Sequence, residues 1–153
     1  MKTIILLTSL LLTSQAMANS SGSVIISGTI TAETSISVNG VGDFNSLDLT
    51  SNQRNLTVAN ITEVNNTASG YAVNLESANR GKLKNGNSSI TYTAKYDNQS
   101  VNLNSRDEVT SVSSQNEAIN RTKELKISYD GEDSSDLLAG EYSDTLTFTI
   151  SAN

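Results

Sequence analysis

Residues 145–150 read TLTFTI, in which three threonines alternate with Leu146, Phe148 and Ile150. Strict alternation of polar and apolar residues is typical of a β-strand with one face on a core and the other in water. We therefore expect these three apolar side chains to be buried and the threonines to face outward. This is the clearest strand signal in the chain.

The same period-2 pattern recurs upstream, in segments separated by clusters of Asn, Gly, Asp and Ser. Roughly eight or nine short strands bounded by turns predict an all-β fold, an antiparallel sandwich. The tyrosines lie in register with the apolar residues, so we expect them in or at the edge of the core. The clearest alternating sets are Tyr71, Val73 and Leu75, then Ile90, Tyr92, Ala94 and Tyr96, then Leu125, Ile127 and Tyr129.

Residues 105–120 do not fit the strand pattern. Val109, Val112 and Ile119 have roughly helical spacing, but the segment is mostly polar and has no clear stop signal. A loop is the favoured interpretation and a short helix the alternative.

The N-terminus resembles a secretory signal peptide over residues 1–18. Lys2 precedes a short apolar run, and Ala16-Met17-Ala18 provides a small-residue cleavage site. An uncleaved anchor is the alternative, although the run is too short to cross a bilayer. We expect an exported protein with an N-terminal extension at 19–32 and one domain at 33–153.

The extension contains a second alternating stretch, SVIISGTITA at 23–32. Val24, Ile26, Ile30 and Ala32 fall on one side of an extended ribbon, with Gly28 between them. Such a terminal strand can pair within its own domain or add to the sheet of another molecule.

Composition excludes several classes of function. The 153 residues carry a formal net charge of −6, which disfavours nucleic acid as a partner. The chain has no His and no Cys, so the usual catalytic triads, soft metal sites and disulfides are excluded. Residues 130–136, DGEDSSD, offer oxygen ligands but not the spacing of a calcium loop, so a solvated turn is favoured. We expect no enzyme activity, no metal and no cofactor.

Four segments resemble the spore coat protein U family, which includes the pilins of archaic chaperone–usher systems. The most distinctive is the ending AGEYSDTLTFT at 139–149. The segment GYAVNL at 70–75, followed by ITY at 90–92, is similar to the family's central strands. VGDF at 41–44 is similar to a short motif that follows its first strand. The chain departs from many members in lacking a disulfide and in having Leu138 where proline is frequent.

The resemblance implies an immunoglobulin-like sandwich that lacks its last strand and is completed by a donor strand, a segment supplied by another subunit. A periplasmic chaperone would fill the open groove first, and an outer-membrane usher would assemble identical or related pilin subunits into a surface fimbrium. The inserted residues would be Val24, Ile26, Gly28, Ile30 and Ala32. Two alternatives stay open: a self-complemented secreted or surface sandwich, and a tip adhesin.

Overall fold

The computed structural model describes residues 20–153, so the predicted signal peptide at 1–18 lies outside the described residues. Contacts divide the chain after Ile30, and the second unit, Thr31–Asn153, contains all the described strands. These are β1 (Thr34–Gly40), β2 (Gln53–Asn65), β3 (Tyr71–Ser77), β4 (Lys82–Asn85), β5 (Ser88–Tyr96), β6 (Gln99–Val101), β7 (Asp107–Val112), β8 (Ile119–Tyr129) and β9 (Leu146–Ala152).

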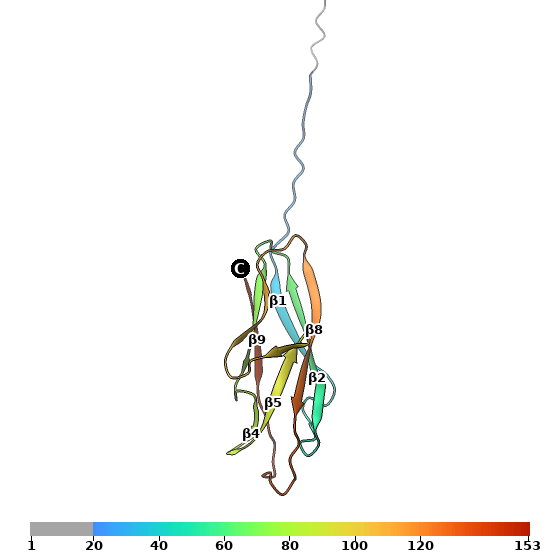
Figure 1. The fold of residues 1–153 in the computed structure, drawn as a ribbon. Coiled ribbons are helices and arrows are strands. Elements are labelled where there is room, and N and C mark those ends of the chain that lie inside the picture. Colours follow the sequence, from blue (N-terminus) through green and yellow to red (C-terminus); the bar gives the residue numbers. More distant parts are fainter. Residues whose placement is uncertain (1–19) are drawn as a thin grey trace, which may run out of the picture. The chain divides into compact units, whose positions relative to one another are not determined.

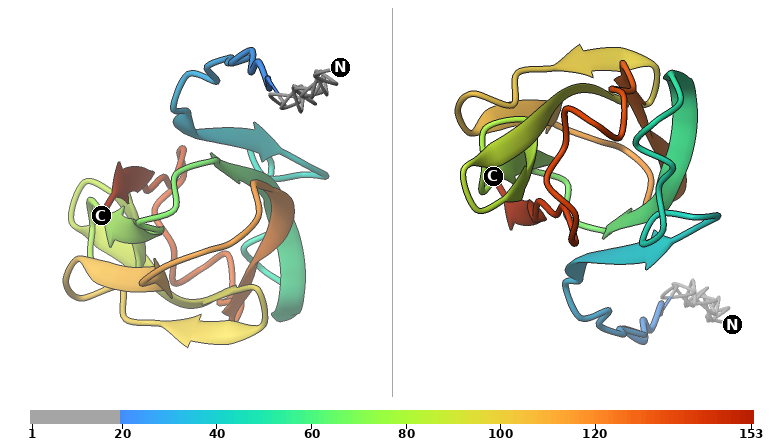
Figure 2. Two further views of the ribbon diagram at one scale, coloured as in Figure 1. Left: turned by 90° about the horizontal axis from the view of Figure 1, so that it is seen from above. Right: turned by 90° about the horizontal axis from the view of Figure 1, so that it is seen from below.

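The strands form two antiparallel sheets (Figure 1). The larger has the order β1-β2-β8-β5-β4, with β6 also paired to β5, and the smaller has the order β7-β3-β9. Viewed along the strands, the sheets surround one interior (Figure 2). The predicted all-β antiparallel sandwich is confirmed. No helix in the described residues is long and apolar enough to cross a membrane.

The core follows the predicted alternation. In β5 every second residue from Ile90 to Tyr96 is buried while the residues between them are exposed, and β8 behaves similarly from Leu125 to Tyr129. Tyr71, Tyr92, Tyr96 and Tyr129 are all buried, and Tyr142 is half-buried, as predicted. The tyrosines therefore serve packing, with each hydroxyl reaching a polar partner.

The prediction of a loop at 105–120 is wrong for residues 107–112, which form β7 on the edge of the smaller sheet, and for residues 119 and 120, which begin β8. The β3–β7 register shifts between Val73 and Asn74, and both Val109 and Thr110 are half-buried as a result. This bulge interrupts the simple alternation. A polar edge strand of this kind is specified by its partner strand, which local sequence does not reveal.

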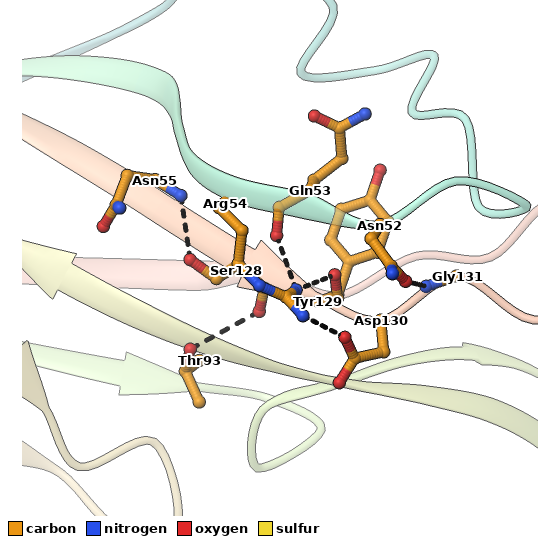
Figure 3. Close-up of polar contacts among 9 residues, drawn as sticks. All are labelled: Asn52, Gln53, Arg54, Asn55, Thr93, Ser128, Tyr129, Asp130 and Gly131. Carbon is orange, nitrogen blue, oxygen red and sulfur yellow. Dashed lines mark hydrogen bonds and ion pairs between the residues drawn. The ribbon is translucent and has the colours of Figure 1, made fainter.

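The start of β2 is also irregular, and polar contacts hold it against the end of β8 (Figure 3). Asn55 has a positive φ of 53°, and its N–H donates to Ser128 Oγ instead of to the ladder. Arg54 donates to the carbonyl of Tyr129 and forms an ion pair with Asp130. These contacts compensate for the ladder bonds lost at the bulge.

Candidate functional site

Two open strand edges of the domain, one from each sheet, lie near each other. Within the described residues, β1 pairs only with β2, and β9 pairs only with β3. Strands β1 and β9 come within 8 Å of each other between Cα atoms, yet no ladder joins them. Each strand thus presents a row of backbone N–H and C=O groups that another strand could pair with.

The inward face of β9 is incompletely covered. Leu146, Phe148 and Ile150 point inward and the intervening threonines are exposed, so the predicted register is confirmed. The predicted full burial is wrong, because all three side chains are only half-buried. Val38, on the inward side of β1, is 51% exposed. These side chains lack cover because none of the strands at 20–153 lies between β1 and β9.

An apolar groove follows from this missing cover. It has a volume of about 350 Å³ and shares Phe44, Leu47, Leu83 and Asp144 with an adjoining, more polar cavity of about 430 Å³. Its lining combines the two open strands with buried core residues, so a side chain that entered it would contact the core directly. The residues that line it are Val38, Gly40, Phe44, Leu47, Val58, Ala59, Leu83, Tyr92, Leu125, Ile127, Asp144, Leu146 and Phe148.

Asp144 fixes the start of β9 at the edge of this groove. Its Oδ2 accepts hydrogen bonds from Ser77 Oγ and Tyr92 OH, both at 2.6 Å. Its Oδ1 accepts from the N–H groups of Asn79 and Thr145. Burial and the neighbouring Asp144 carboxylate raise the pKa of Tyr92 far above its usual value. One carboxylate thereby connects both sheets and the turn after β3.

Glu63 connects the sheets near the other end of β9, where Tyr71 pairs with Ala152. Its side chain is fully buried, and it accepts hydrogen bonds from Tyr96 OH at 2.6 Å and from Tyr71 OH at 2.9 Å. Thr110 Oγ1 and Lys123 Nζ also lie 2.9 Å from its carboxylate oxygens. The five side chains come from β2, β3, β5, β7 and β8.

The protonation states in this cluster follow from burial and hydrogen bonding. Burial alone would raise the pKa of Glu63, but the hydrogen bonds from Tyr96, Lys123, Thr110 and Tyr71 outweigh it and hold the pKa below the usual value. Burial and the Glu63 carboxylate raise the pKa of both tyrosines strongly. The cluster therefore contains an ionised carboxylate surrounded by four donors. It is a structural bridge between the two sheets.

The sequence-predicted donor residues lie in a segment without regular secondary structure, 20–33. Val24, Ile26 and Ile30 are 82–91% exposed, and so is Ile25 on the opposite side of the ribbon. Gly28 and Ala32 are also exposed, and a Cβ added at Gly28 would meet no atom within 4 Å. The extension therefore presents its apolar residues to solvent.

The acidic turn at 130–136 is hydrogen-bonded to the rest of the fold at its first three residues, the third through the N–H of Glu132, which donates to the carbonyl of Leu49 at 3.1 Å. Asp130 pairs with Arg54, and the N–H of Gly131 donates to Asn52 Oδ1 (Figure 3). A Cβ at Gly131 would lie 2.5 Å from the backbone of Thr50 and Ser51. Among the described residues, no group of three or more acidic side chains is placed to hold a metal ion.

Sequence reasoning missed Glu63 and Asp144 as structural centres. Glu63 had a readable signal, because it follows Ile61 by two residues and so falls on the inward face of an apolar strand. Its partners are distributed over four other strands and carry no such signal. Asp144 lies within the AGEYSD segment quoted above, but its four contacts depend on the folded turn after β3.

No protein-family model matches this chain, and no curated protein matches it either, so the spore coat protein U resemblance stays a prediction. Among solved structures, the crystal structure of the P pilus rod subunit PapA is similar, with 14% sequence identity and a TM-score of 0.47. The match covers 78% of this chain and 99% of that chain.

Proposed function

We propose that this protein is a structural subunit of a surface fimbrium, in which the extension of one copy fills the groove of the next. The observation that carries the proposal is the presence, in one chain, of an exposed apolar segment and an apolar groove with two open strand edges. β-strand addition satisfies both, because backbone hydrogen bonds complete the ladders while alternate side chains enter the groove.

The composition of the extension suits insertion into an apolar groove. Residues 20–30 contain no charged side chain, so insertion would bury no unpaired charge. Val24, Ile26 and Ile30 share one side, and burying each of these side chains contributes about 1.5–3 kcal/mol. Gly28 has no side chain and so leaves a gap in this row of apolar side chains. Such a gap suits a place where two backbones approach closely.

Insertion into another copy is favoured over insertion into the same domain. To enter its own groove, the extension would have to reverse direction just before β1. Residues 29–33, TITAE, contain none of the Gly, Asn, Asp or Pro residues that tight turns use. The composition of this stretch disfavours a self-complemented sandwich, the main alternative.

Insertion also requires a local movement. A strand placed between β1 and β9 needs about 9.5 Å between them, twice the spacing of paired strands. The two strands are closer than this where their Cα atoms lie within 8 Å. Since β1 is attached to the sandwich through β2 alone, we expect β1 to move outward on insertion. A periplasmic chaperone and an outer-membrane usher are the further partners that this route to the cell surface would need.

The test uses a peptide spanning residues 20–32 and the chain shortened to residues 33–153. Peptide at about 100 times its Kd should raise the free energy of unfolding of the shortened chain by about 2.7 kcal/mol. A peptide with Ile26→Asp and Ile30→Asp should have no effect, because it would bury carboxylates in the groove. The matched control carries Ser27→Asp and Thr29→Asp, on the opposite side of the ribbon, and should retain most of the effect.

The full mature chain provides the second measurement. It should form ladders on a nondenaturing gel, and Ile26→Asp should abolish them. A chain that stays monomeric, whose shortened form gains nothing from the peptide, would contradict the proposal and support the self-complemented alternative.

A further inference from the structure

The backbone just before β1 is hydrogen-bonded to Asn66, through both the main chain and the side chain of this residue. The N–H of Asn66 donates to the carbonyl of Glu33 at 3.1 Å, which extends the β1–β2 ladder by one residue. The Asn66 side chain makes two more hydrogen bonds to the same segment. Its Nδ2 donates to the carbonyl of Thr31 at 2.9 Å, and its Oδ1 accepts from the N–H of Glu33 at 2.7 Å.

These two side-chain bonds bracket Ala32. A carboxamide that accepts from one residue's N–H and donates to the C=O two residues earlier imitates the backbone of a neighbouring strand. The two peptide groups that flank Ala32 are therefore already hydrogen-bonded within their own domain. The Thr31 carbonyl and the Glu33 N–H point to one side of the extended chain, so on that side this stretch cannot pair with an open edge of another copy unless the bonds to Asn66 break.

We call the Asn66 side chain with its two hydrogen bonds to Thr31 and Glu33 the clamp. The loop that carries it is held in place by further hydrogen bonds. The preceding residue, Asn65, is fully buried, and its Oδ1 accepts from the hydroxyls of Thr34 and Thr67. Gln115 Nε2 donates to the carbonyl of Asn65, and the Gln115 N–H donates to the carbonyl of Ala68. Asn66 thus projects from a loop whose backbone is fixed on both sides.

We propose that Asn66 ends the donor segment at Ile30 and makes the joint between successive copies short and stiff. This inference rests on the proposed function. It retains Val24, Ile26, Gly28 and Ile30 as inserted residues and assigns Ala32 to the domain that it precedes.

The spacing explains why the joint is stiff. Ile30, the last inserted residue, is followed directly by Thr31, whose carbonyl is bound by Asn66, and consecutive Cα atoms are only 3.8 Å apart. No free linker residue remains between the two copies. The partner at this end of the domain, around the 66–70 loop, is therefore a second copy of the same chain in direct contact.

The test compares Asn66→Ala with Asn116→Ala in the full mature chain. Asn116 is an exposed asparagine in the segment that follows Gln115, so it controls for loss of an amide near the same end of the domain. Backbone amide exchange is measured by NMR or mass spectrometry on monomers and on assembled fibres. The distribution of bend angles between adjacent copies is measured by electron microscopy.

In the unchanged protein, the Glu33 amide should be protected equally before and after assembly, whereas the amides of residues 24–30 should gain protection only in the fibre. Asn66→Ala should speed exchange at Glu33 about tenfold, the equivalent of 1.4 kcal/mol. It should still assemble, with a broader range of bend angles. Asn116→Ala should change neither quantity.

Three outcomes would overturn the inference. Bend angles that are unchanged in Asn66→Ala fibres would show that the clamp does not stiffen the joint. A Glu33 amide that gains protection on assembly would place the boundary beyond Ile30. An unchanged protein that never assembles would refute the proposed function and the clamp together, and so differs from the first two results.

Discussion

Replacement of Glu63 by Gln tests whether the buried carboxylate holds the two sheets together. The change keeps the size of the side chain but removes the charge that Lys123 Nζ meets at 2.9 Å. The Lys123 side chain is only 15% exposed, so it would be left nearly buried without its counter-ion. Removing one partner of a buried pair costs about 3–5 kcal/mol.

The structure places the expected cost of Glu63→Gln near the lower end of this range. Lys123 would keep its 2.7 Å hydrogen bond to Thr110 Oγ1 and its position over the Tyr96 ring. We expect a loss of about 3 kcal/mol in the free energy of unfolding. For a domain of this size the midpoint of thermal unfolding should fall by about 10–15 °C.

The assay is urea and thermal unfolding at pH 7, followed by circular dichroism. The matched control is Glu124→Gln, since Glu124 pairs with Lys126 at 2.8 Å but has a side chain that is 52% exposed. This variant should lie within about 0.5 kcal/mol of the unchanged protein. Adding Lys123→Met to Glu63→Gln should recover part of the loss by removing the unpaired charge. A Glu63→Gln variant as stable as the Glu124→Gln control would refute the reasoning.

The pH dependence of the free energy of unfolding tests the role of Glu63 independently. Its pKa is lowered in the folded state relative to 4.5, so its ionised form contributes stability above pH 4.5. This contribution is lost as the pH falls through the lower, folded-state pKa. The difference in unfolding free energy between the unchanged protein and Glu63→Gln should thus be constant above about pH 5.5 and shrink in acid.

Three further predictions concern the groove, a turn and the tyrosines. Phe148→Ala should lower the free energy of unfolding by about 2–3 kcal/mol when the groove is empty, since the half-buried ring lies 5.5 Å from the Tyr96 ring between centroids. The loss should be larger when the peptide spanning residues 20–32 fills the groove. Equal losses in urea unfolding would contradict an open groove. Gly70→Ala should destabilise the domain by more than 1 kcal/mol, because φ is 79° and the added Cβ would overlap the carbonyl oxygen of Val112; an unchanged thermal midpoint would refute this. The pKa values of Tyr92 and Tyr96 are raised in the folded state, so their protonated forms contribute stability below pH 10.0 that is lost as the pH rises toward the folded-state pKa values. Ultraviolet titration should therefore show these two phenols ionising only when the protein unfolds, not near pH 10.0.

The strands were predictable from sequence where one face meets the core. β5 and β9 alternate without interruption, so period 2 alone gave their register. β7 was not predictable, because its polar residues form a strand only by pairing with β3 across a bulge. The depth of burial in β9 was also beyond the sequence. Alternation shows which face points inward but not whether a neighbouring strand covers it.

The candidate site, too, was predictable from the sequence only in part. The exposed extension was readable as an apolar ribbon, because its pattern is local. The groove was expected only through the resemblance, since it exists where β1 and β9 fail to pair, and these strands are about a hundred residues apart in the chain. Asn66 carried no signal at all. Its role depends on a side chain that lies opposite the residues before β1.

A sandwich with an open groove needs other means of holding its sheets together, and this chain has no cysteine for a disulfide. Two buried or half-buried carboxylates provide the connection, one near each end of β9. Glu63 joins β2 to β3 and β7, and Asp144 joins β9 to β3 and β5. Between them the inward face of β9 stays half-covered. The two sheets can therefore stay joined while the inward face of β9 remains open for the inserted strand that we propose.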